Sequence, residues 1–228
     1  STDGTIEQRL DRYQQVRETE ALKLQSAARN RMTWFEDIER YVHLPPEQLA
    51  FSLLTASQRV GHENLKLRDP GYIDAYDRWF AQSAGVKFKD TAPPPMFTPF
   101  SIRGATLKNR VVVSPMATYS AKDGLPNDFH MMHLGSRALG GAALLFTEMT
   151  ATSPDGRITP GCTGIWTDEQ ASAWGRIVKA VHENSDALIA MQIGHSGRKG
   201  STRLAWDGID QPLSSGNWPL LSASALPY

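Results

Sequence analysis

The sequence predicts an α/β domain with a parallel sheet, preceded by an α-helical segment. Beyond residue 95, short apolar runs begin at Val111, Ala142 and Ala187, and helical patterns lie between them around residues 131–139 and 171–182. This alternation is typical of βαβ units. Residues 1–82 have apolar side chains at helical spacing and no such alternation, which predicts helices alone.

The helical segment shows two patterns. Helical spacing relates five apolar or aromatic residues, namely Trp34, Phe35, Ile38, Tyr41 and Val42. A further helix is expected where Pro45-Pro46-Glu47, a sequence suited to a first turn, precedes Leu49, Leu53 and Leu54.

A proline run separates the two parts. Pro93, Pro94 and Pro95 stiffen the chain into an extended form and prevent a helix from continuing through it. We therefore expect a linker at residues 83–95 and the α/β domain at residues 96–228.

Composition excludes several classes of protein. Of the 228 residues, 40% are hydrophobic and 21% charged, as in an ordinary globular protein. Lys plus Arg equals Asp plus Glu at 24 each, which argues against nucleic acid or an anionic membrane as a partner. No membrane span or signal pattern is present, and Cys162 is the single cysteine. A cytoplasmic location is the expectation.

Three predicted strand ends carry side chains that could contact a ligand, and ligands of parallel α/β proteins lie beyond the carboxyl ends of strands. The ends are Ser114-Pro115-Met116-Ala117, Thr147-Glu148-Met149-Thr150 and Gln192-Ile193-Gly194-His195. Ser114 and Gln192 can hydrogen-bond a heterocycle, and Met116 and Met149 offer soft surfaces to a flat ring. Tyr119 has a stacking face and a hydroxyl. These groups suit a flavin; the alternative is core packing, with Gln192 capping a loop.

Longer motifs carry a family resemblance. The stretches MFTPFSIRGATLKNRVVVSPMATYS, FHMMHLGSRALGGAALLFTEMTATSPDGRIT, GIWTDEQ and QIGHSGRKG, in this order, resemble the opening part of the old yellow enzyme family over about residues 95–200. The resemblance implies an incomplete (β/α)8 barrel, FMN as cofactor and NADH or NADPH as hydride source. It places Ser114, Pro115, Met116, Ala117, Met149 and Gln192 at the FMN and Tyr119 at the substrate. Ala117 stands where several bacterial members have a cysteine.

The helical segment is similar to another group. AARNRMTWFEDIERY and PPEQLAFSLLTASQRVGHENLKLRDP resemble the C-terminal end of the FAD-dependent hydroxylase half in fused enzymes. These are the 2-aminobenzoyl-CoA monooxygenase/reductases and salicylyl-CoA 5-hydroxylases, whose reductase half is of the old yellow type. The implied substrate is an aromatic CoA thioester; the alternatives are a free-standing reductase of enones and a catalytically silent docking module.

Several residues of the implied enzyme are expected elsewhere. No GxGxxG fingerprint occurs, so FAD would bind upstream of Ser1. The catalytic residues and the phosphate site are expected beyond Tyr228, because a (β/α)8 barrel needs about 250 residues. We expect the open sheet to associate, so that the protein forms a homo-oligomer.

The remaining candidates are assigned simpler roles. His130 and His133 lack a carboxylate at ligand spacing and are expected to pack a helix, so no metal site is predicted. Cys162 has no evident base beside it and is interpreted as structural. Arg198 and Lys199 could attract a nicotinamide cofactor or a CoA thioester, or could form a solvated basic loop.

Overall fold

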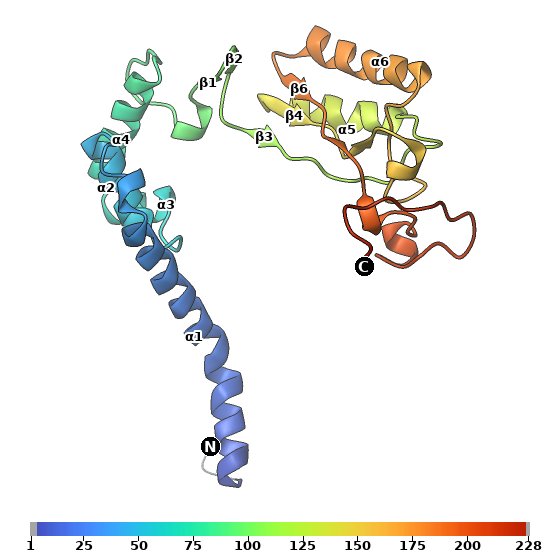
Figure 1. Ribbon diagram of the computed structural model, residues 1–228. Helices are drawn as coiled ribbons and strands as arrows, with labels where there is room; N and C mark the ends of the chain where they lie inside the picture. The colour runs from blue at the N-terminus through green and yellow to red at the C-terminus, as the bar shows by residue number, and fades with distance from the viewer. Residues whose placement is uncertain (1–3, 227–228) are drawn as a thin grey trace. The chain divides into compact units, whose positions relative to one another are not determined.

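The computed structural model describes residues 4–226, which divide into two compact units. The helical unit comprises the chain up to Ser83 together with Lys87–Pro93. The βα unit comprises Ala84–Val86 and the chain from Pro94 onward. Each unit has its own buried residues and is described separately (Figure 1).

The helical unit contains α-helices and one short 3-10 helix. This agrees with the sequence of residues 1–82, in which strand patterns do not alternate with helical ones. They are α1 (Ile6–Glu36), η1 (Ile38–Arg40), α2 (Pro46–Thr55), α3 (His62–Arg68) and α4 (Pro70–Ser83). α1 begins at a capping box: the Gln8 N–H donates to the Thr5 hydroxyl at 3.3 Å, and the Thr5 N–H donates to the Gln8 side chain at 2.9 Å. Pro46 occupies the first turn of α2, where its missing N–H costs no hydrogen bond.

The pattern around Trp34 does not belong to one continuous helix. α1 ends at Glu36, because the Asp37 backbone leaves the helical conformation while its N–H still donates to Thr33 and Phe35. Trp34 is buried, whereas Phe35 and Val42 are 54% and 61% exposed. The Trp34 indole donates to the Ser52 hydroxyl at 2.8 Å and stacks on Tyr41, which joins α1 to α2.

Aromatic contacts and one side-chain hydrogen bond hold the other helices together. Phe51 of α2 stacks on Tyr76 of α4 with ring centroids 4.2 Å apart. His62 at the start of α3 contacts the buried Asp77 of α4 through Nε2 at 2.8 Å. Ile73 of α4 is fully buried and belongs to the small core of this unit.

The βα unit carries the predicted alternation of strands and helices. Its elements are η2 (Pro95–Phe97), β1 (Phe100–Ile102), β2 (Ala105–Leu107), β3 (Val112–Val113), α5 (Asp128–Leu139), β4 (Leu144–Phe146), β5 (Thr150–Ala151), η3 (Pro154–Gly156), α6 (Asp168–Asn184), β6 (Leu188–Ala190), β7 (Ile193–Gly194), η4 (Gly197–Lys199) and η5 (Ala205–Asp207). The three predicted strands and two predicted helices correspond to β3, β4, β6, α5 and α6.

The predicted parallel sheet has the order β3-β4-β6. Val113 pairs with Leu145, and Phe146 pairs with Ala190. Because all three strands run in the same direction, their carboxyl ends reach the same edge of the sheet.

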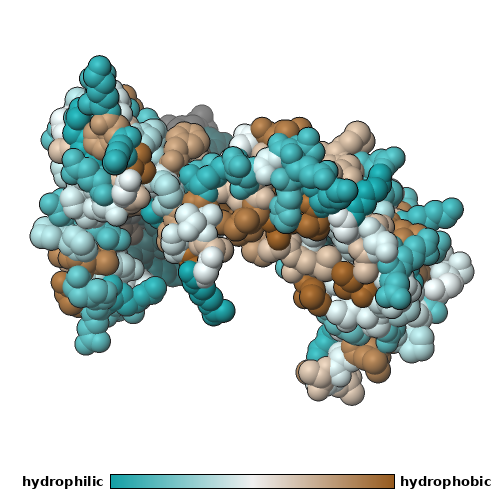
Figure 2. Space-filling model, turned by 90° about the horizontal axis from the view of Figure 1, so that it is seen from above, coloured by the Kyte–Doolittle hydropathy of each residue, from teal (hydrophilic) through white to brown (hydrophobic). Residues whose placement is uncertain are grey.

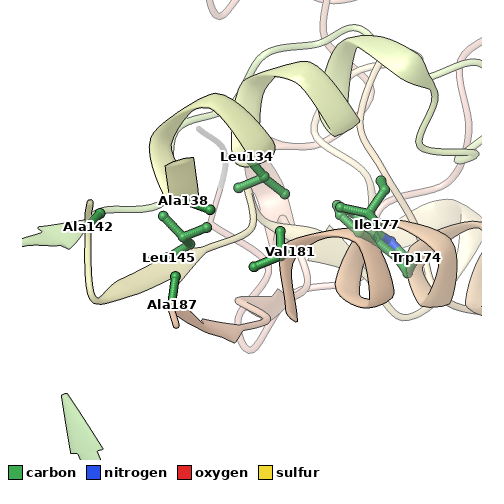
Figure 3. Packing of buried hydrophobic residues seen from close by; sticks show 8 residues of the cluster. All are labelled: Leu134, Ala138, Ala142, Leu145, Trp174, Ile177, Val181 and Ala187. Carbon is green, nitrogen blue, oxygen red and sulfur yellow. The ribbon is translucent and has the colours of Figure 1, made fainter. Parts of the chain in front are cut away.

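The core lies between this sheet and the two helices. Leu134 and Ala138 of α5, Leu145 of β4, and Ile177 and Val181 of α6 point toward one another (Figure 3). Trp174, Ala142 and Ala187 complete the buried cluster. Burying these side chains fixes both helices against one face of the sheet.

Two strand pairings were not predicted. β1 and β2 form an antiparallel hairpin, and β5 pairs in parallel with β7 just beyond the ends of β4 and β6. Beside β5, the Thr163 hydroxyl is fully buried and lies 3.3 Å from the Thr150 hydroxyl. Strands of two or three residues are too short for a readable alternation of side chains.

Apolar side chains remain at the surface of the βα unit among polar ones (Figure 2). Val112, Met116 and Ile193 are 43%, 45% and 62% exposed. Within residues 4–226, no helix has the length and apolar character needed to cross a membrane.

Candidate functional site

The candidate site is the edge of the sheet where β3, β4 and β6 end. Ser114 follows β3 directly, Thr147 follows β4, and Met191 and Gln192 follow β6. The register that pairs Val113 with Leu145 and Phe146 with Ala190 brings these three exits together. The structure therefore gathers the three predicted segments from positions far apart in the sequence.

The segment after β3 presents its side chains outward. Ser114, Met116 and Ala117 are exposed, and Pro115 is half-buried. A proline at this position cannot donate to a sheet ladder, so the strand ends at Val113. The exit from β3 is thus an extended segment with a hydroxyl and a thioether open to a ligand.

Gln192 uses its backbone, and not its side chain, to hold the loop after β6. Its N–H donates to the Thr147 hydroxyl at 3.2 Å, and its carbonyl accepts from the Thr150 N–H at 2.8 Å. The side chain is exposed and makes no hydrogen bond to other residues within 4–226. Its carboxamide is available to a ligand.

Met149 is half-buried against a glycine on the neighbouring segment. A Cβ added at Gly194 would lie 2.7 Å from Cγ and 3.0 Å from Sδ of Met149. Only the absence of a side chain at position 194 therefore lets Met149 adopt this position. The β5–β7 pairing, which joins Ala151 to Gly194, brings the two segments together.

A buried acid lies directly behind these exits. Glu148 is 6% exposed, and its carboxylate accepts from the Thr118 N–H and the Thr118 hydroxyl, each at 2.9 Å. Its Oε1 also lies 2.8 Å from Nε2 of the buried His130. The segment after β3 is thereby connected to the end of β4 and to α5.

Tyr119 has an unusual backbone conformation. Its φ is +50°, in the left-handed region that non-glycine residues rarely adopt. A Cβ at Gly161 would lie 2.3 Å from the Tyr119 carbonyl oxygen, so the two backbones approach closely. The ring meets Trp206 edge-on at 6.3 Å, and burial raises the pKa of the phenol. Tyr119 is thus held at the margin of the site in its neutral form.

Two residues placed outside the site by the sequence interpretation have specific partners. His130 was interpreted as a helix-packing residue; it is buried with its ring 6.1 Å from that of Trp174 of α6, and it also joins the N-cap Asn127 to Glu148. The sequence NDFH contains the cap signal, but the Glu148 partner lies 18 residues away and has no local signature. His133 stacks on Phe129. Burial lowers the pKa of its imidazole, and the positive charge of the nearby Arg137 lowers it further.

Cys162 and the basic loop lie outside this cluster of exits. Cys162 is 1% exposed, and burial raises the pKa of its thiol, as befits a packed side chain. Arg198 lies in η4 and donates to Ser224. Within residues 4–226, no three His, Cys, Asp or Glu side chains are grouped so as to hold a metal ion.

The groups at the sheet edge fit a flavin ring. Thioethers are polarisable and pack against flat rings, while a free carboxamide and a hydroxyl can pair with the polar edge of a heterocycle. Met116, Met149, Gln192 and Ser114 supply these groups from three strand ends. Each of the three exits therefore offers a group of the kind that contacts a flat heterocycle.

Comparison with known proteins covers this same region. Residues 95–214 match the sequence model of the NADH:flavin oxidoreductase / NADH oxidase family. An NADH:flavin oxidoreductase of Gibberella zeae is 40% identical over 126 residues, which cover 54% of this chain and 30% of that protein. An NADPH dehydrogenase of Bacillus subtilis is 44% identical over 106 residues, covering 46% and 31%. The chain spans about a third of the length of these relatives.

Solved structures give similarly partial overlaps. The old yellow enzyme of Trypanosoma cruzi is 29% identical, with a TM-score of 0.47 over 58% of this chain and 35% of that one. Morphinone reductase in complex with tetrahydroNAD is 35% identical, with a TM-score of 0.44 over 48% and 29%.

Proposed function

Because this chain belongs to the NADH:flavin oxidoreductase / NADH oxidase family, we propose that it forms part of an FMN-dependent oxidoreductase that uses NADH or NADPH. From residue 96 onward, the chain has the predicted α/β fold, the opening strands and helices of an incomplete (β/α)8 barrel. One observation carries the proposal: three parallel strands end at one edge with Ser114–Ala117, Met149 and Gln192.

Each residue at this edge has a proposed role. Gln192 and Ser114 would hydrogen-bond the polar edge of the flavin ring, while Met116 and Met149 would contact its flat surface. Pro115 and Ala117 would line the same segment, and Tyr119 would face the substrate. When bound, FMN would supply the redox chemistry, accepting a hydride from the nicotinamide cofactor and passing it to an electrophilic substrate.

We further infer that the substrate is an aromatic CoA thioester of the 2-aminobenzoyl-CoA or salicylyl-CoA type. The support is the helical unit, in which AARNRMTWFEDIERY forms the end of α1 and η1. This stretch resembles the end of the FAD-dependent hydroxylase half of fused monooxygenase/reductases. The reductase part would then reduce a ring that the hydroxylase part, with its own FAD, has made non-aromatic.

A free-standing reductase of enones is the second candidate. It is favoured by the relatives, which are described as NADPH dehydrogenases and a morphinone reductase. The two candidates differ in substrate, so the natural full-length polypeptide should be assayed for NADH and NADPH oxidation with 2-aminobenzoyl-CoA and with cyclohexenone. Turnover of cyclohexenone alone would reject the CoA thioester.

The flavin site is tested by Gln192→Leu in the same polypeptide. If the amide pairs with the flavin, its loss leaves a polar group of the ring unpaired and weakens FMN binding by about 1–3 kcal/mol. Gln15→Leu, at an exposed position of α1, is the matched control and should leave FMN affinity unchanged. Equal affinities for wild type and both variants would remove Gln192 from the site.

A further inference from the structure

Three polar groups contact the carboxylate of Glu148 at a buried position. Thr118 supplies two of them, its N–H to Oε2 and its hydroxyl to Oε1, both at 2.9 Å. The side chains of Glu148 and His130 are only 3% and 4% exposed, and Nε2 of His130 lies 2.8 Å from Oε1. Oε1 of Glu148 thus has two hydrogen-bond partners and Oε2 has one.

His130 links the helix cap to Glu148. Nδ1 of His130 lies 3.0 Å from the Asn127 backbone nitrogen and 3.1 Å from Oδ1 of Asn127. The other ring nitrogen, Nε2, lies 2.8 Å from Oε1 of Glu148. The same imidazole therefore completes the cap of α5 and orients the acid.

Thr118 lies between the two parts of the proposed site. Ala117 precedes it at the flavin segment, and Tyr119 follows it at the substrate position. The Ser120 hydroxyl donates to the Thr118 carbonyl, and the Asn127 side chain donates to the Ser120 carbonyl. The chain after Thr118 is therefore fixed by these bonds, and Thr118 itself by its bonds to Glu148.

We propose that Glu148 is a positioning residue that holds the segment Ser114–Tyr119 across the strand ends through Thr118, with His130 orienting its carboxylate. This inference rests on the proposed function, because the segment matters only if FMN and substrate bind there. Glu148 touches neither; it acts through Thr118. The bonds would keep the flavin contacts and Tyr119 in register with one another.

The test is a pair of substitutions at Thr118 in the natural full-length polypeptide. Thr118→Val removes the hydroxyl donor and keeps the shape and the N–H, whereas Thr118→Ser keeps the hydroxyl. We therefore expect Thr118→Val to weaken FMN binding at least about 10-fold and to raise KM for the oxidising substrate. Thr118→Ser should remain close to wild type in both.

Two further variants separate positioning from general stability. Thr163→Val removes a buried hydroxyl in the same unit that bonds the Thr150 hydroxyl and not the Glu148 carboxylate, so it should lower Tm without changing FMN affinity. His130→Gln keeps a residue suited to the cap of α5 but is too short to orient Glu148. It should therefore alter the visible absorption spectrum of bound FMN in the same direction as Thr118→Val.

The outcomes distinguish this inference from the function on which it rests. If the wild-type polypeptide binds no FMN, the proposed function is wrong and the inference falls with it. If wild type binds FMN but Thr118→Val matches Thr118→Ser in affinity, KM and spectrum, the function stands and the role of Glu148 is rejected. The inference is also rejected if Thr163→Val weakens FMN binding as much as Thr118→Val.

Discussion

Tyr119 illustrates how much the site depends on single residues. Its left-handed backbone conformation costs about 1–2 kcal/mol for a residue with a Cβ. The neighbouring bonds of Thr118 and Ser120 and the close approach of Gly161 hold it in that conformation. Such strain is kept where the surrounding structure fixes the backbone firmly.

The close approach at Gly161 predicts a strong response to one methyl group. Gly161→Ala would place Cβ 2.3 Å from the Tyr119 carbonyl oxygen, and backbone cannot move aside as a flexible side chain can. We expect the free energy of unfolding to fall by about 1–3 kcal/mol, as for other overpacked sites. Urea unfolding followed by tryptophan fluorescence measures the change.

Gly135→Ala is the matched control for this substitution. Gly135 lies in α5, and a Cβ there meets nothing within 4 Å. Since alanine favours a helix over glycine by about 1 kcal/mol, this variant should be more stable than wild type. A Gly161→Ala protein as stable as wild type would show that the contact between Gly161 and the Tyr119 carbonyl does not hold the Tyr119 backbone in place.

At the scale of elements, caps fix where the two helices of the βα unit begin. α6 starts at a capping box in which the Gln170 N–H donates to the Thr167 hydroxyl at 3.2 Å, and Gln170 accepts from the Thr167 N–H at 3.2 Å. Gln170 also donates to the Asp123 carbonyl in the loop before α5. The start of α6 is thus connected to the segment that follows Tyr119.

Removing this cap should destabilise the unit measurably. Thr167→Ala loses the hydroxyl acceptor and is expected to lower the free energy of unfolding by about 1 kcal/mol. Thr167→Ser retains the acceptor and should stay within a few tenths of a kcal/mol of wild type. Thermal unfolding followed by circular dichroism compares them, and equal Tm values for the two variants would assign no stability to the cap.

At the scale of the whole molecule, the chain passes between its two units through residues 84–94. Lys87–Pro93 belongs to the helical unit, where Arg78 donates to the Asp90 carbonyl at 2.7 Å and Ala92 is buried. Met96 and Phe97, beyond the prolines, are 52% and 53% exposed. Beyond this stretch, the carbonyls of Pro94 and Pro95 accept hydrogen bonds from Phe97 and Thr98, and the Met96 carbonyl accepts one from Arg110.

Limited proteolysis tests whether this stretch acts as a linker. We propose that cutting occurs first between about Gly85 and Met96 and releases a helical fragment and a βα fragment, because exposed connections are cut before packed elements. Mass spectrometry of early products identifies the site. Protection of this stretch while α1 or the loop after η5 is cut would contradict a linker at residues 83–95.

Local chemistry explains why the sequence alone predicts much of the fold. Apolar periodicity and β-branched runs depend on near neighbours, and they correctly predict β3, β4, β6, α5 and α6. The family motifs can also be identified from the sequence alone. They indicate the three strand exits that the parallel register brings together. The short strand pairs β1–β2 and β5–β7 were not predicted, because strands of two or three residues are too short to show an alternation of apolar and polar side chains.

The sequence by itself therefore determined the α/β alternation, the exits at Ser114, Met149 and Gln192, and membership of the flavin oxidoreductase family. Only the tertiary structure decided that Glu148 binds Thr118 and His130, which lie 30 and 18 residues away. The physical reason is that the meeting of these side chains depends on the register of β3 with β4 and on the packing of α5. Neither leaves a periodic signal in the chain.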